Sequence, residues 1–146
     1  MKAIDHLHMP ELLSNEYPVQ LSDTEQETYK QFKSELILEM QDTEITAANA
    51  AALSNKLSQL ANGAVYDDTG AVIPIHSRKL DALEDLIEAT NGKPVLVAYW
   101  FKHDRTRIAE RLQRLRVSYQ EIQSSDSIRN WNARRLQVGL LHPAAA

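Results

Sequence analysis

The stretch PVLVAYWFKHDRTRIAERLQRLRVSYQEI, residues 94–122, decides the fold class. Residues 95–101 are a continuous apolar run rich in β-branched and aromatic side chains, which is typical of a strand covered on both faces of a parallel sheet. Asp104 is placed to cap a helix whose apolar face holds Ile108, Leu112 and Leu115, and residues 117–122 supply a second strand. This order predicts a right-handed parallel crossover.

The pattern continues to the end of the chain. Residues 124–126 can start another helix, with Ile128 and Trp131 facing inward, and residues 138–141 form a third strand. Residues 93–146 are therefore expected to alternate strand and helix in a three-layer α/β fold with a small, mostly parallel sheet. The edges of such a small sheet are open, which permits a homodimer through strand pairing.

Residues 22–92 are predicted to be mainly helical, after a leader over residues 1–21 that includes a short strand at 17–21. Ser22 and Glu25 have capping-box spacing at the start of a first helix, and Asn62-Gly63 ends a second. A hairpin then turns at residues 67–70, and a third helix stops at residues 91–92. The apolar stripes of the three helices are Tyr29, Phe32, Leu36 and Met40; Ala50, Leu53, Leu57 and Leu60; and Leu80, Leu83 and Ile87.

The composition of the 146 residues is that of one ordinary globular domain. No window approaches the roughly 18 consecutive apolar residues of a membrane span, and the start has no export signal, so a cytoplasmic protein is expected. The sequence has no cysteine, which excludes disulfides, thiolate catalysis and sulfur-ligated metals.

Charge is divided unevenly along the chain. Residues 1–92 hold 6 Lys/Arg against 16 Asp/Glu, whereas residues 93–146 hold 10 against 4. The basic half suggests a patch for polyanions, although a solvated helix face produces a similar count.

Most familiar catalytic patterns are absent. There is no glycine-rich phosphate loop, and Lys102-His103-Asp104 stands where a dinucleotide fold needs its glycine turn. His6 and His8 lack a third ligand nearby, and Asp67-Asp68 fits a turn better than an acid/base pair. We expect neither a catalytic nor a metal site.

Lys102, His103 and Arg105 are the strongest binding candidates by position. They lie where a strand ends and a helix begins, and free helix amides together with cations attract phosphate. A solvated amphipathic face is an equally good reading of these three residues. Tyr99 and Trp100 are better read as strand-end packing than as base-stacking platforms.

Four strings in order resemble the second RecA-like lobe of Swi/Snf-type superfamily-two helicases, particularly the phage and prophage form. They are YPVQLSDTEQETYKQF (17–32), AALSNKLSQLANGAVYDD (51–68), HSRKLDALEDLIEATNGKPVLVAYWFKHD (76–104) and IRNWNARRLQVGLLHPAAA (128–146). The resemblance covers most of the chain. It implies that residues 22–146 are an incomplete, truncated helicase C-terminal lobe.

The resemblance also implies a nucleic-acid-binding role for particular residues. Four residues match the motif IV region, namely Trp100, Phe101, Lys102 and His103, and Arg105 follows them as a further candidate. Motif V begins at His142, Pro143, Ala144 and Ala145. The chain departs from the family in lacking the first lobe, most of motif V and the arginines of motif VI. Those parts stabilise charge in phosphoryl transfer.

The expected function is therefore that of a fragment of a DNA-dependent ATPase. It contacts DNA weakly through the backbone, needs the missing first lobe as a partner and does not hydrolyse ATP alone. ATP and Mg²⁺ belong to the intact parent enzyme, and the fragment binds no cofactor. The alternative is a stand-alone protein-interaction module that uses the exposed sheet edge or the acidic helices.

Overall fold

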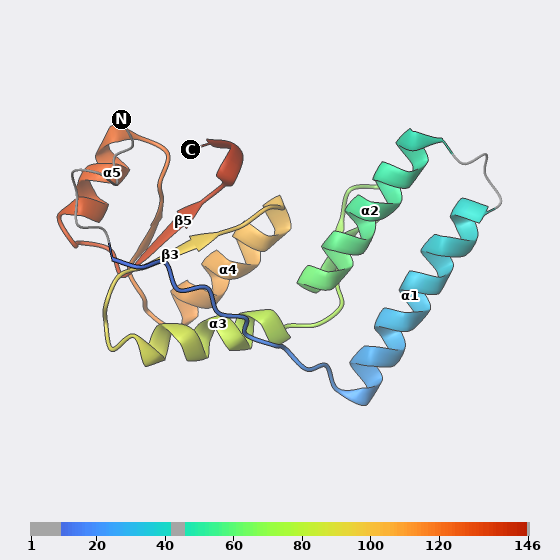
Figure 1. Cartoon of the computed structure of the whole chain (residues 1–146), viewed down its shortest axis with the longest axis horizontal. Coiled ribbons are helices and arrows are strands. Elements are labelled where there is room, and N and C mark those ends of the chain that lie inside the picture. The colour runs from blue at the N-terminus through green and yellow to red at the C-terminus, as the bar shows by residue number, and fades with distance from the viewer. Residues whose placement is uncertain (1–9, 42–45, 146) are drawn as a thin grey trace.

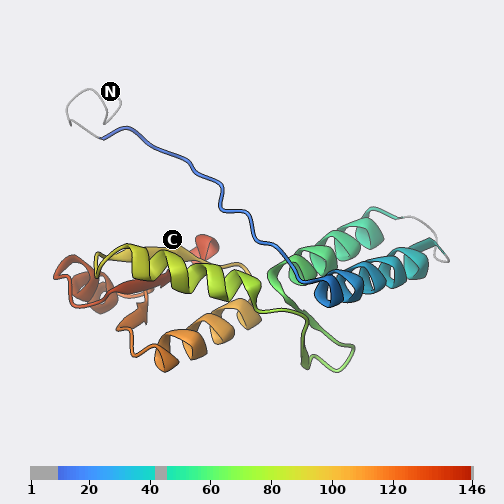
Figure 2. The same ribbon diagram turned by 90° about the horizontal axis from the view of Figure 1, so that it is seen from below.

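The computed structural model describes residues 10–41 and 46–145. Helix α1 (Asp23–Gln41) and helix α2 (Ala47–Asn62) lie side by side and form an arm, and the hairpin of β1 (Ala64–Tyr66) and β2 (Val72–Pro74) follows. The remaining elements are α3 (Arg78–Ala89), β3 (Val95–Ala98), α4 (Lys102–Arg114), β4 (Tyr119–Glu121), α5 (Ser125–Asn132) and β5 (Val138–Leu141). They form a body from which the arm projects (Figure 1; Figure 2).

The body is built around a three-stranded parallel sheet with the strand order β3-β5-β4. The chain crosses from β3 to the far edge through α4 and returns to the centre through α5. Right-handed crossovers in opposite directions place their helices on opposite faces. One face accordingly packs Val138 and Leu140 against α3 and α4, while on the other face the position of Gly139 lies under Trp131 of α5. The predicted α/β class and parallel strands are confirmed.

The predicted strand at residues 17–21 is wrong, because described residues 10–22 contain no helix or strand and Val19 is only half-buried. The three helices and the hairpin of residues 22–92 are confirmed. The apolar stripes of the first two helices are less buried than predicted, since Phe32 and Leu36 are half-buried and Ala50 is exposed. The side chain of Met40, together with His6 and His8, lies outside the described residues.

Three details of the body also differ from the prediction. The strand expected at 95–101 stops at Ala98, and it is not covered on both faces, since Leu96 is 52% exposed. The reason is its place at the edge of a narrow sheet; β5, in the centre, is the covered strand. Ile128, expected inside, is 49% exposed, so of the two apolar side chains expected inside only Trp131 packs on the sheet.

Asp104 is not the N-cap of α4 but its third residue. Phe101 holds the cap position, and its amide donates to Asp104 Oδ2 at 3.1 Å. The strand expected at 117–122 is likewise shortened to Tyr119–Glu121. Across the part of the chain that the structure describes, no helix combines the length and the apolarity that a membrane crossing requires.

Candidate nucleic-acid interface

The carboxyl ends of the three parallel strands meet at one edge of the sheet, which we call the carboxyl edge. Ligands of open α/β sheets bind outside this end of the strands. Here a hollow of about 850 Å³ opens between the body and α2. Its lining includes four of the predicted site residues, namely Trp100, Lys102, Arg105 and His142.

Trp100 is the most prominent side chain of the carboxyl edge. It is 58% exposed, and its ring stacks on that of His142, with centroids 5.5 Å apart and planes 24° apart. The sequence predicted that Trp100 packs at the end of a strand. Its packing partner, His142, lies far along the chain, after the last strand of the body. The outer face of the indole remains a flat apolar surface in solvent.

His142 acts as the support for Trp100. The amide of Ala144 donates to His142 Nδ1 at 3.2 Å, and His142 Nε2 lies 3.0 Å from the carbonyl oxygen of Trp100. Since Nδ1 accepts, Nε2 carries the proton and donates, so both ring nitrogens are occupied. His142 therefore orients the loop and has no free nitrogen for a phosphate. Pro143 and Ala144 are exposed and belong to a short 3-10 helix that ends at Ala145.

The predicted cations of this edge are not equivalent. Lys102 is exposed, and its amine has no partner among the described residues. Arg105 instead forms an ion pair with Glu121, Nη2 to Oε2 at 2.8 Å. Glu121 also accepts from the Tyr99 hydroxyl at 2.7 Å, and burial together with this hydrogen bond raises the pKa of Tyr99. Lys102 thus supplies the uncompensated positive charge of the hollow.

His103 does not reach the surface. It is 2% exposed, and its ring lies between Phe101, stacked at 5.3 Å, and Tyr66, edge-on at 5.1 Å. Burial lowers its pKa; Arg107 adds to this shift, and Asp104, whose Oδ1 is 3.2 Å from Nδ1, opposes it. The predicted phosphate contact of His103 therefore has no surface to act from in this structure.

A polar joint between arm and body is the feature that the sequence did not predict. Asn62, at the end of α2, donates to Asp104 Oδ2 at 2.9 Å, and Lys79 donates to Asn62 Oδ1 at 2.8 Å. Arg107 donates to the carbonyl oxygens of Asn62, at 3.0 Å, and His76. Because the partners are 17 to 45 residues apart, no local pattern connects them.

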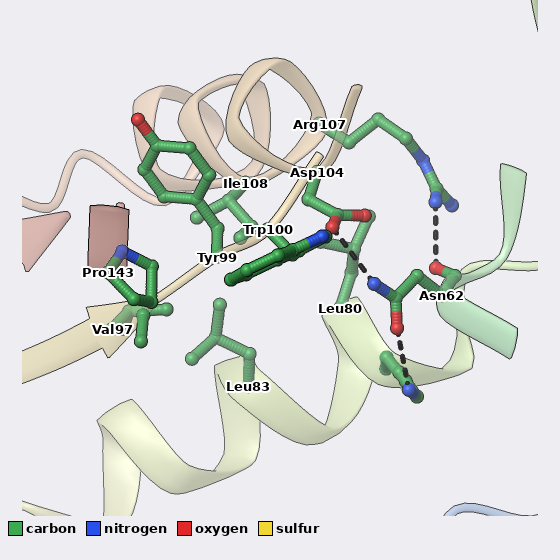
Figure 3. A pocket seen from close by; sticks show the side chains of 12 residues that line it. Asn62, Leu80, Leu83, Val97, Tyr99, Trp100, Asp104, Arg107, Ile108 and Pro143 are labelled. Carbon is green, nitrogen blue, oxygen red and sulfur yellow. Dashed lines mark hydrogen bonds between the residues drawn. The ribbon is translucent and has the colours of Figure 1, made fainter. Parts of the chain in front are cut away.

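The joint forms the polar end of a second pocket, of about 440 Å³, with apolar walls (Figure 3). Trp100 extends across this pocket toward Asp104, so the same indole borders both the pocket and the cationic hollow (Figure 3). The walls are Leu80, Leu83, Val97, Ile108 and Pro143.

The chemistry of the carboxyl edge is that of a binding surface. An exposed aromatic ring beside a free cation suits a stacked base and its phosphate. Within the described ranges, no group of three or more His, Asp or Glu side chains is arranged to hold a metal ion.

Comparison with known proteins gives a match to a phage protein. The chain is 33% identical over 150 aligned residues to "Putative protein p41" of Acyrthosiphon pisum secondary endosymbiont phage 1. The alignment covers 99% of this chain but 31% of that protein, so the chain spans about a third of its phage relative. No family model and no solved structure matches.

Proposed function

We propose that this chain is the DNA-contacting part of a larger DNA-dependent ATPase of the Swi/Snf type, inactive in ATP hydrolysis by itself. Three findings support the proposal. The four ordered sequence strings resemble the second motor lobe, the body is a parallel α/β sheet, and the phage relative is about three times as long as the chain.

The observation that carries the proposal is the placement of Trp100 beside Lys102. The indole is held by His142 with one face in solvent, and the lysine next to it in the hollow is uncompensated. Stacking on an aromatic ring contributes about 1–3 kcal/mol per base, and a lysine adds a salt-dependent phosphate contact. The hollow therefore suits a single strand better than an intact duplex, whose bases are already stacked.

The test is binding of a short fluorescein-labelled single strand, measured by anisotropy at several salt concentrations. Trp100→Ala is expected to weaken binding by roughly tenfold at every salt concentration, because a stacked base is lost. Lys102→Gln is expected to lower the salt dependence by about one phosphate contact.

Lys33→Gln is the matched control, because Lys33 is an exposed lysine of α1 outside the hollow. Unchanged affinity for both Trp100→Ala and Lys102→Gln would contradict the proposal. A second readout uses the Trp131→Phe background, in which Trp100 is the remaining tryptophan. Quenching of its fluorescence by the single strand is expected there.

ATP and Mg²⁺ are assigned to the intact parent and not to this chain. The assignment rests on the resemblance, since the phosphate loop and the motif VI arginines have no counterpart in the 146 residues. Steady ATP turnover by the purified chain, with or without DNA, would contradict it.

The free edge of β3 supports a second candidate function, protein binding or homodimerisation. Among the described strands β3 pairs with β5 alone, and Leu96, within β3, is half exposed. An open strand edge can pair with another chain. Light scattering across a range of concentrations tests this candidate: a dimer that Leu96→Lys dissociates would favour it, and a monomer at every concentration would not.

A further inference from the structure

The basic half of the protein has more positive charge than the carboxyl edge uses. Four of its ten cations have partners. Arg105 pairs with Glu121, and Arg129 pairs with Asp126. Arg111 pairs with both Asp81 and Glu84, and Arg107 donates to backbone carbonyls. The other six have no carboxylate within ion-pair distance in the part of the chain that the structure describes. They are Lys93, Lys102, Arg114, Arg116, Arg134 and Arg135.

Five of these six cations lie at the opposite end of the sheet from Trp100, which we call the amino edge. Each crossover helix runs back along the sheet and ends where the next strand begins, so the ends of α4 and α5 lie at this edge together with the turn that enters β3. Lys93 precedes β3, Arg114 ends α4 and Arg116 follows it, and Arg134 and Arg135 follow α5.

Three of the four acids of the same half are placed away from this edge; the fourth, Glu110, lies one turn before Arg114 on α4 and forms no ion pair with it. Asp104 and Asp126 lie in the first turns of α4 and α5, and Glu121 ends β4. Glu88, in the last turn of α3, is an exposed acid near the amino edge, and it forms no ion pair with any of the five cations. The positive potential therefore gathers at the amino edge.

Two of the cations occupy positions where arginine is conformationally unfavourable. Arg116 and Arg134 adopt left-handed backbone angles, φ 56° and 55°, just after α4 and α5. Helices usually end there with glycine or asparagine, as α3 does with Asn91 and Gly92. A cation near the C-terminal end of a helix interacts favourably with the helix macrodipole. An arginine at a neighbouring position would make the same interaction without the left-handed backbone strain. Strained residues of this kind concentrate at functional sites.

The amino edge is also hollowed. A depression of about 430 Å³ is lined by Lys93, Arg134 and Arg135, with Asn91, Ser118 and Gln137 as neutral polar groups. The lining contains neither an acid nor an aromatic ring. Protein interfaces are anchored by buried aromatic side chains, which this lining lacks, and its apolar side chains are limited to Pro94 and Leu136. Phosphate contacts need cations and polar donors, which make up most of the lining.

We infer that the amino edge is a second nucleic-acid surface, which binds the sugar-phosphate backbone without reading sequence. It does not depend on the stacking site at Trp100, and it goes beyond the proposed function. Contacts of this kind are electrostatic and weaken as salt rises.

The decisive variant is the pair Arg116→Gly and Arg134→Gly. Glycine relieves the left-handed backbone, so the urea midpoint of the double variant is expected to rise. Affinity for a short labelled duplex is expected to fall roughly tenfold near 100 mM salt, with the log–log salt slope lowered by about two. A variant that is more stable yet binds less tightly has not lost binding by misfolding.

Arg129→Gln is the matched control, because Arg129 is an exposed arginine of α5 that is already paired with Asp126 and does not line the depression. It is expected to leave the salt slope unchanged. An unchanged slope in the double glycine variant, also after Lys93→Gln is added, would overturn the inference. Competition by poly-glutamate as effective as DNA per charge would overturn the assignment to nucleic acid.

The experiments distinguish between failure of the site at Trp100 and failure of the amino edge. If Trp100→Ala weakens single-strand binding while the amino-edge variants bind normally, the proposed function stands and this inference falls. If only the amino-edge variants lose binding, the inference stands and the stacking site falls.

Discussion

Gly63 is the residue on which the exit from α2 depends. Its φ is +95°, and an added Cβ would lie 2.4 Å from the carbonyl oxygen of His76. Gly63→Ala is therefore expected to destabilise the protein by about 3 kcal/mol, because left-handed strain and a backbone clash add. Urea unfolding followed by circular dichroism measures the change.

Gly70→Ala is the matched control for this prediction. Gly70 is also left-handed, at φ +83°, but an added Cβ would meet nothing within 4 Å. The expected loss is about 1 kcal/mol. Equal losses at Gly63 and Gly70 would show that the clash with His76 does not matter.

At the scale of elements, the joint between arm and body depends on Arg107. Its guanidinium donates to the carbonyl oxygens of Asn62 and His76, and burial lowers its pKa. Arg107→Met removes the donors and leaves two carbonyls unpaired, so a loss of about 2 kcal/mol is expected in urea unfolding.

Arg105→Met serves as the comparison. Arg105 lies on the same helix as Arg107 and forms a half-exposed ion pair with Glu121. Such pairs contribute about 0–1 kcal/mol. If Arg107→Met were no more harmful than Arg105→Met, the joint would not be a structural requirement.

The packing of α5 on the sheet predicts a second effect at this scale. An added Cβ at Gly139 would lie 3.0 Å from the Trp131 ring and 3.1 Å from side-chain carbons of Ile122 and Leu96. Gly139→Ala is expected to destabilise the protein by about 1–2 kcal/mol through overpacking. Trp131→Leu in the same chain should recover part of that loss, and a double-mutant cycle in urea measures the coupling. Simple additivity would refute the contact.

Local sequence signals predict the individual helices and strands of this protein, but they do not predict the contacts between these elements. The apolar run after Pro94 and the cap at Ser124 lie within single elements, so the presence of a strand and of a helix is predicted correctly there, although the strand ends at Ala98. Whether Leu96 and Ile128 are covered depends on the width of the sheet, which no window of residues reports. The site was predicted in the same partial way: Trp100, Lys102 and His142 share a hollow, while the burial of His103 follows from Tyr66, 37 residues away.

At the scale of the whole molecule, buried histidines make stability depend on pH. Burial lowers the pKa of His76 and of His103 below the usual 6.5. As pH falls below about 6.5, the unfolded chain takes up protons at these residues that the folded protein does not, so the folded state loses stability. The urea midpoint is therefore expected to be lower at pH 5.5 than at pH 7.5.

The carboxylate of Glu25 loses its stabilising effect at a lower pH than this window. The hydrogen bond from Arg78, with that from the Ser22 amide, lowers the pKa of Glu25 from 4.5 to about 2, so its stabilising effect is lost only below about pH 4.5. Replacing His76 and His103 together with glutamine should flatten the profile between pH 7.5 and 5.5. A double variant that kept the full pH dependence would assign it elsewhere.

The arm and the body differ in charge. Helices α1 and α2 with the hairpin of residues 64–74 hold 3 Lys/Arg against 7 Asp/Glu, whereas residues 78–141 hold 12 against 8, and this division has a consequence before any contact is made. A particle with negative charge at one end of its long axis and positive charge at the other has a permanent electric dipole, and a polyanion in the distance exerts a torque on it. The protein would thus rotate body-first while still diffusing, which speeds productive encounters in dilute buffer and fades when counterions shorten the reach of the field.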